Sequence, residues 1–139
     1  MKVKEIMHKG AECVAPDTFV ITLAKKMLTD DIGVLPVHEN GRLIGIVTDR
    51  DIALRAFANG KDVSMLTARD VMTKRVSCCH DTEEVAGAVR LMESKHIRRL
   101  PVLDENDKLV GMLCLGDVST AMPREVTGEL MQAVSAHHA

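Results

Sequence analysis

The sequence predicts a mixed helix and strand fold, α/β in class (α+β in some schemes), built from two copies of one unit. The first observation is a duplication, because residues 3–58 return, with their landmarks in the same order, as residues 68–122. A Leu-Pro-Val run at 35–37, for example, returns at 100–102. The second observation is that each copy reads as strand, helix, strand, strand and helix. Together they predict two βαββα units.

The first copy opens with a short extended run and a helix. Pro16 stops the run at 12–15, and Asp17-Thr18 follow with the side chains that favour a helix N-cap. Apolar residues at helical spacing predict a helix over 18–30. Gly33 is then expected to release the chain into a strand.

A hairpin and a second helix complete the first copy. Strands are predicted at 34–37 and 43–47, on either side of a tight turn at Asn40-Gly41. Pro36 has no backbone donor, so its strand is expected to lie at an edge or beside an irregularity. The next helix should run from about 48 to 57.

The remainder of the chain is a linker, the second copy and a tail. We divide it into repeat 1 at 1–58, a polar linker at 59–67, repeat 2 at 68–122 and a C-terminal helical tail at 123–139. One extra residue in repeat 2 falls at 104–107, where a hairpin turn tolerates it. The expected elements are a helix start at 68–72, strands at 76–79, 99–103 and 108–114, helices at 83–95, 116–122 and 125–134, and a frayed end at His137-His138-Ala139.

Composition excludes several functions. The chain has 139 residues, a net charge of −2, two Phe and neither Trp nor Tyr. It therefore lacks both the basic face and the aromatic platform of nucleic-acid binding proteins. Neither a membrane span nor a secretion signal is present in the sequence, so we expect a cytoplasmic protein with no membrane partner.

Four cysteines could form a site, but their spacing does not match a zinc or redox motif. They are Cys13, Cys78, Cys79 and Cys114. Cys13 and Cys78 occupy the same position in the two copies, which favours a shared packing role. His80 beside Cys78 and Cys79 keeps a metal or redox role open. No metal site is predicted.

The segment 45–51, Gly-Ile-Val-Thr-Asp-Arg-Asp, carries the functional signal, because an apolar strand ends there and a helix begins. Unpaired N–H groups at a helix start favour a phosphate, and Thr48 adds a hydroxyl. Asp51 can accept hydrogen bonds from the two hydroxyls of a ribose. Asp49 lies in the same candidate site. The alternative is that Thr48 and Asp51 merely cap the helix.

The duplicated arrangement resembles a tandem pair of cystathionine beta-synthase (CBS) domains, also called a Bateman module. The resemblance covers residues 3–122 and rests on the Asp-Thr helix start, the Leu-Pro-Val strand and Gly-x-x-Thr-x-x-Asp at 45–51. It is strongest to small stand-alone bacterial members. The family implies two βαββα repeats packed sheet to sheet about a pseudo-twofold axis, with clefts that bind AMP, ADP, ATP, NAD(H) or S-adenosylmethionine.

Carried over by position, Thr48 and Asp51 would hold phosphate and ribose, and the backbone of Val14 and Ala15 would read the adenine edge. The second copy departs from this pattern. Cys114 replaces the threonine, so that only Asp117 matches the polar part of the motif. Arg98 and Arg99 precede the second Leu-Pro-Val strand, where the family often places a basic residue that reaches phosphates.

These observations favour a regulatory module over an enzyme, because no nucleophile with a positioned base is evident. The module would sense an adenosyl ligand, require no cofactor and signal to a separate effector protein. An interaction scaffold with non-binding clefts is the alternative. A homodimer is also expected, since twofold self-association would bury apolar helix faces that the two-layer fold leaves uncovered. These faces include Ile52, Ala53, Ala56, Val89 and Met92.

Overall fold

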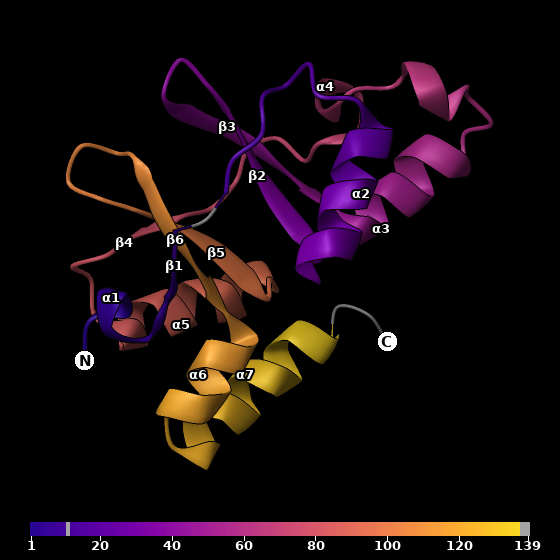
Figure 1. The fold of residues 1–139 in the computed structure, drawn as a ribbon. Coiled ribbons are helices and arrows are strands. Elements are labelled where there is room, and N and C mark those ends of the chain that lie inside the picture. The colour runs from indigo at the N-terminus through magenta and orange to yellow at the C-terminus, as the bar shows by residue number, and fades with distance from the viewer. Residues whose placement is uncertain (11, 137–139) are drawn as a thin grey trace. The chain divides into compact units, whose positions relative to one another are not determined.

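The structure is a computed structural model that describes residues 1–10 and 12–136, so the expected frayed end at 137–139 lies outside the described residues. The chain forms two compact units (Figure 1). Residues 12–76 make up one, here called the first-repeat unit. Residues 1–10 join residues 77–136 in the other, the second-repeat unit. The start of the chain thus packs with the repeat that is distant in sequence.

The first-repeat unit has an antiparallel hairpin covered by helices. Val14 pairs in parallel with Val37 on one side of the hairpin, and Thr73 pairs antiparallel with Ile46 on the other. The elements are α2 (Val20–Asp30), β2 (Val34–Glu39), β3 (Arg42–Thr48), α3 (Asp49–Asp51), the π-helix η1 (Ile52–Phe57), the 3-10 helix η2 (Val63–Met65) and α4 (Ala68–Val71).

The second-repeat unit has the same plan with longer outer strands. Its sheet order is β1-β6-β5-β4, in which β4 runs parallel to β5 and the other pairs are antiparallel. The elements are α1 (Val3–Ile6), β1 (His8–Lys9), β4 (Cys79–His80), α5 (Val85–Lys95), β5 (Arg99–Leu103), β6 (Leu109–Cys114), α6 (Leu115–Ala121) and α7 (Arg124–Ala136). The α+β class and the βαββα order expected from the sequence are confirmed.

The glycine of each hairpin makes room for the strand that packs beside it. A Cβ at Gly45 would lie 2.8 Å from the Thr73 carbonyl oxygen and 2.9 Å from the Met72 sulfur. A Cβ at Gly111 would lie still closer to the carbonyl oxygen of His8. Glycine is therefore required at both positions, since any larger residue would push away the backbone of the neighbouring segment.

The predicted turn and the predicted end of the first long helix are both confirmed. Asn40 and Gly41 both have positive φ, 53° and 77°, as a two-residue hairpin turn demands. The strand register shifts between Val37 and His38, directly after Pro36, as the missing donor suggested. Helix α2 ends at Asp30, the residue predicted from the sequence. Asp31 caps it in the left-handed conformation with φ 53°, which an aspartate tolerates.

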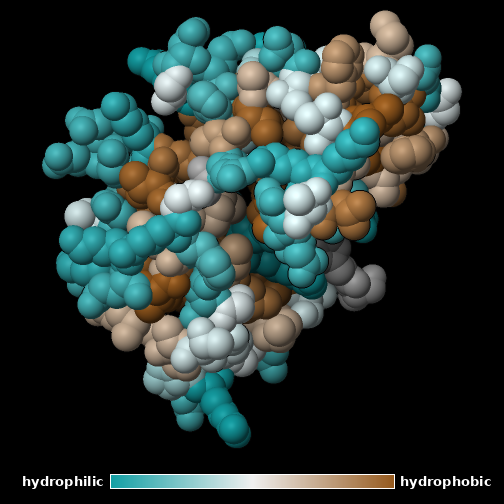
Figure 2. Space-filling view, viewed as in Figure 1, coloured by the Kyte–Doolittle hydropathy of each residue, from teal (hydrophilic) through white to brown (hydrophobic). Residues whose placement is uncertain are grey.

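Each unit buries its own aliphatic core, and this overturns part of the expected dimer surface. Ile52 and Ala56 lie in the core of the first-repeat unit, and Val89 and Met92 lie in that of the second. Of the named residues only Ala53 is exposed. Figure 2 shows apolar side chains gathered at the surface near α2 and η1, at the upper right. The large exposed apolar residues of this unit are Phe19, Ile21, Leu28, Ile32, Leu54, Phe57 and Met65. Within the part of the chain that the structure describes, no helix is long and apolar enough to cross a membrane.

Candidate functional site

Thr48 and Asp51 form a reciprocal cap where β3 ends and α3 begins. The Thr48 N–H donates to Asp51 Oδ2 at 2.9 Å, and the Asp51 N–H donates to Thr48 Oγ1 at 3.0 Å. The capping interpretation of these residues is therefore confirmed. Capping does not exclude a ligand, because a carboxylate has about four acceptor sites and this cap uses one of them.

The other N–H groups at this helix start are also paired. The Asp49 N–H donates to the Gly33 carbonyl at 3.0 Å, and the Arg50 N–H donates to Asp49 Oδ1 at 2.9 Å. The expectation of unpaired N–H groups ready for a phosphate was thus wrong. The α-helical stretch is also only three residues long before it widens into η1, so its dipole is small.

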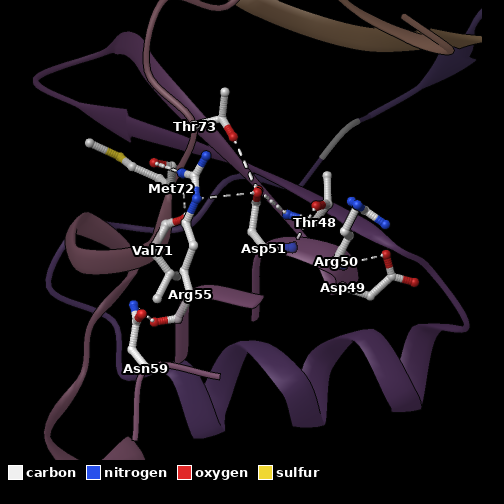
Figure 3. A network of polar contacts seen from close by, with 9 residues as sticks. All are labelled: Thr48, Asp49, Arg50, Asp51, Arg55, Asn59, Val71, Met72 and Thr73. Atoms are coloured by element: carbon white, nitrogen blue, oxygen red, sulfur yellow. Dashed lines mark hydrogen bonds and ion pairs between the residues drawn. The ribbon is translucent and has the colours of Figure 1, made fainter. Parts of the chain in front are cut away.

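Two further side chains converge on Asp51 from the same unit (Figure 3). Thr73 Oγ1 donates to both carboxylate oxygens at 3.3 Å. The Arg55 guanidinium lies 3.9 Å from Asp51 Oδ1 and donates to the carbonyls of Val71 at 3.1 Å and Met72 at 2.8 Å. The Asp51 side chain remains 12% exposed. The carboxylate is therefore held in one orientation and still reaches solvent.

Asp49 does not join this network. Its carboxylate points away from Asp51 toward the backbone of Arg50, and the residue is exposed (Figure 3). Of the predicted residues on the 45–51 segment, the structure brings together Thr48 and Asp51 and leaves Asp49 outside.

The candidate adenine-reading backbone lies at the other edge of the same hairpin. The Val14 N–H donates to the Pro36 carbonyl at 2.9 Å, and the Val14 carbonyl accepts from the His38 N–H at 3.0 Å. Both backbone groups of Val14 are thus used in the sheet. Ala15 is exposed, and its carbonyl accepts from the Thr18 N–H at 3.1 Å. Within the described residues no hydrogen bond is found for the Ala15 N–H.

The second-repeat unit repeats the carboxylate with different partners. Asp117 is only 8% exposed and is the one buried charged residue in the described part of the chain. The Cys114 N–H donates to its Oδ2 at 2.8 Å, and His8 Nδ1 lies 2.8 Å from its Oδ1. His8 occupies the position that Thr73 has in the other unit, since both pair with the strand of the motif.

The two arginines of the second-repeat unit lie differently. Arg99 is the cross-strand partner of Cys114. Burial raises the pKa of the Cys114 thiol, Asp117 raises it too, and the positive charge of Arg99 only partly opposes them. Arg98 is exposed, and its carbonyl accepts from the Leu115 N–H at 2.9 Å. Arg99 is therefore the arginine adjacent to the motif.

The thiols have the character of packed side chains. Burial raises the pKa of Cys13 and Cys78, and it raises the pKa of Cys79 to about 12. The His80 ring contacts Asp107 at 2.9 Å rather than the neighbouring thiols. Among the described residues no group of three or more His, Cys, Asp or Glu side chains is placed to hold a metal ion. The protonated thiol is the form favoured at neutral pH.

The site residues missed by sequence reasoning are Thr73, Arg55 and His8. Thr73 and His8 follow Met72 and Met7 at the 65-residue spacing of the duplication, so their equivalence was visible in the sequence. Their contact with the carboxylates was not visible, because it depends on which repeat each segment packs against.

Comparison with known proteins identifies the family. The family model of the CBS domain matches residues 3–57 and 68–124. The CBS domain-containing protein YhcV of Bacillus subtilis is 35% identical over 96% of this chain and 94% of its own length. Hypoxic response protein 1 of Mycobacterium tuberculosis is 29% identical over 94% of this chain and 92% of its own. A Methanopyrus kandleri protein, MK0525, is 35% identical over 88% of this chain, which spans 63% of that protein.

Solved structures agree with this assignment. The hypoxic response protein, whose structure holds two coordinated zinc ions, matches with a TM-score of 0.79, 30% identity and coverage of 88% of this chain and all of its own. CBSX2 in complex with AMP gives a TM-score of 0.74, 28% identity and coverage of 86% and 94%. The CBS domain pair of MJ0100 in complex with 5'-methylthioadenosine and S-adenosyl-L-methionine gives a TM-score of 0.71 and 28% identity. The match covers 86% of this chain and 94% of that one. With both repeats matched by the family model and the same duplicated fold in these structures, the chain belongs to the CBS domain family.

Proposed function

We propose that the protein is a regulatory module that binds an adenosyl ligand, such as AMP, ADP, ATP, NAD(H) or S-adenosylmethionine. The observation that carries the proposal is the Asp51 carboxylate, which is oriented by side chains on two sides and still exposed to solvent. Support comes from similar CBS proteins, since CBSX2 is known with AMP and MJ0100 with S-adenosyl-L-methionine.

In this proposal Asp51 accepts the ribose hydroxyls, and Thr48 lies beside the sugar and phosphate. Ala15 offers the N–H that reads the adenine edge, while Val14 supplies the sheet pairing that fixes it. Asp49 stays a more distant candidate on the exposed first turn. Because a backbone N–H has a fixed position, a site that binds adenine through it discriminates against bases whose hydrogen-bonding edge differs.

The second-repeat unit would form a weaker site around Asp117. Its Oδ1 is already engaged by His8, and Cys114 is a poor donor beside it. Arg99, with Arg98 nearby in the sequence, would contribute if the ligand carries phosphate. The two sites are therefore proposed to differ in affinity.

Signalling is proposed to pass to a separate effector protein, with a homodimer as the working form. The exposed apolar residues near α2 and η1 replace the buried ones first expected at the dimer surface. A cytoplasmic location, inferred from the sequence, stays a prediction.

An interaction scaffold that binds no ligand is the alternative, and one observation favours it. The N–H groups at the start of α3 are already bonded within the protein, so a phosphate gains little there.

A thermal scan with millimolar AMP, ATP, NAD and S-adenosylmethionine separates the two functions. Ligand that binds only the folded protein adds about 2.7 kcal/mol to the free energy of unfolding at a hundredfold excess over Kd. The proposal expects at least one of these compounds to raise the melting temperature. GMP and CMP should leave it unchanged. No shift with any adenosyl compound supports the scaffold. Mass spectrometry of small molecules released from natively purified protein would identify the ligand.

A further inference from the structure

We infer that Thr73 and Arg55 are positioning residues for the Asp51 site, so that a segment of the second repeat completes the ligand site of the first. The inference rests on the proposed function and names what makes that site competent. Residues 68–73 belong to repeat 2 by sequence, yet they pack in the first-repeat unit with Asp51.

Thr73 is fixed by its backbone before its side chain reaches Asp51. The Thr73 N–H donates to the Ile46 carbonyl at 2.8 Å, and the Ile46 N–H donates back to the Thr73 carbonyl at 3.1 Å. This exchange anchors Thr73 beside β3, which ends directly before the helix that carries Asp51. The hydroxyl then spans both carboxylate oxygens. Rotation of the carboxylate would break one of these contacts, so Thr73 restrains its orientation.

Arg55 joins Asp51 to the end of α4. It lies one helical turn after Asp51, and its Nη1 holds the carbonyls of Val71 and Met72 while its Nε faces the carboxylate (Figure 3). A cation at this place satisfies carbonyls that the helix end leaves unpaired. One side chain thus couples the docking of residues 68–73 to the charge of Asp51.

The acceptor capacity of the carboxylate leaves room for a ligand. Thr48 N–H takes one site on Oδ2 and the Thr73 hydroxyl is shared, whereas Arg55 stands off at 3.9 Å. Two ribose hydroxyls can use the remaining lone pairs of the carboxylate. Because Thr73 and Arg55 preorganise the acceptor, a ligand does not have to restrict it on binding.

The test is calorimetric titration of four variants with AMP and with S-adenosylmethionine. Thr73→Val keeps the side-chain shape and removes the hydroxyl, so we expect affinity to fall about three- to tenfold, the range for one hydrogen bond. Thr73→Ser restores the hydroxyl and should bind within about twofold of wild type. Arg55→Met should weaken binding similarly. Thr29→Val makes the same change on the exposed face of α2 and should have no effect.

The outcomes distinguish this inference from the proposed function. If wild-type protein binds neither compound, and neither ATP nor NAD in the same titration, the proposed function fails and the positioning role falls with it. If wild type binds and Thr73→Val, folded by circular dichroism, binds equally well, the function stands and the inference is overturned. A loss in Thr73→Val that Thr73→Ser does not recover also overturns it, since the hydroxyl would then not be the group that matters.

Discussion

The two units solve the same local problem with different chemistry. In each unit, a carboxylate caps the helix that follows the glycine-containing strand, β3 or β6. The same carboxylate contacts a side chain from a segment that belongs to the other repeat by sequence. Asp51 meets the Thr73 hydroxyl and has 12% of its side chain exposed, whereas Asp117 meets the His8 ring and has 8% exposed. The comparison teaches that the fold maintains the carboxylate and its cap, while the side chain beside it varies from a hydroxyl in one unit to an imidazole in the other.

The largest expected effect concerns the glycines that admit the neighbouring segments. We predict that Gly111→Ala lowers the free energy of unfolding by about 3 kcal/mol, and Gly45→Ala by about 1–2 kcal/mol, because the new methyl group meets backbone oxygen in each case. Urea unfolding measures both. The larger effect is expected at Gly111 because the carbonyl oxygen of His8 approaches Gly111 more closely than that of Thr73 approaches Gly45.

Gly87→Ala is the matched control, since a Cβ there meets nothing within 4 Å on helix α5. It should be neutral or stabilise by about 0.5–1 kcal/mol. Equal effects at Gly45, Gly87 and Gly111 would show that the neighbouring segments do not pack as described.

The next prediction compares the carboxylates as ligand groups. Asp51→Ala should weaken the tighter binding event about ten- to a hundredfold, because ribose hydroxyls lose an acceptor worth about 1–3 kcal/mol. Asp117→Ala should change that event little. Calorimetric titration with AMP decides, after circular dichroism shows that both variants are folded. Equal losses from the two substitutions would mean that the sites are equivalent.

A smaller effect is expected from giving the second-repeat unit the side chains of the first. In the double variant His8→Thr with Cys114→Ser, Asp117 would have a hydroxyl on each side, as Asp51 has. The second binding event should strengthen about three- to tenfold, or appear where none was measurable. Titration of this variant beside Cys78→Ser, which alters a thiol away from the motif, provides the comparison. No change would mean that burial of Asp117, and not its neighbours, limits access.

The smallest expected effect concerns the hairpin turn of the second-repeat unit. Asp107, in the longer turn of the second-repeat unit, raises the pKa of His80 chiefly through their hydrogen bond. A raised folded pKa means that protonated His80 stabilises the protein. The contribution is fully present below the ordinary histidine pKa of 6.5 and is lost as pH rises through the folded value.

Asparagine tolerates the positive φ of 60° at position 107, so Asp107→Asn should leave the turn intact. The substitution should therefore lower the melting temperature at pH 5.5 and leave it unchanged at pH 8.5. Melting curves at the two pH values measure the difference. An equal shift at both would assign the effect to the turn and not to the ion pair.

Much of this molecule was predictable from its sequence, because periodicity and turn chemistry are local. The duplication, the Asn40-Gly41 turn and the cap at Thr48 follow from residue types and spacing. The paired N–H groups of α3 did not follow, since they depend on backbone geometry. The partners Thr73 and His8 were invisible for another reason. Which repeat a segment joins is a tertiary choice that the pattern of one repeat does not contain.

Residues 1–10, which pack with the second-repeat unit, cannot reach their folded position until most of the chain has been synthesised. His8 and Lys9 pair with Met112 and Gly111, about a hundred residues later, so these first residues leave the ribosome long before their partners exist. The first-repeat unit, by contrast, has all its strands once residue 73 has emerged. Such distant contacts pay a large loop-closure cost and form slowly. During synthesis, residues 1–10 should therefore stay unpaired until β6 is made, and Val3, which is buried in the folded protein, should stay exposed until then.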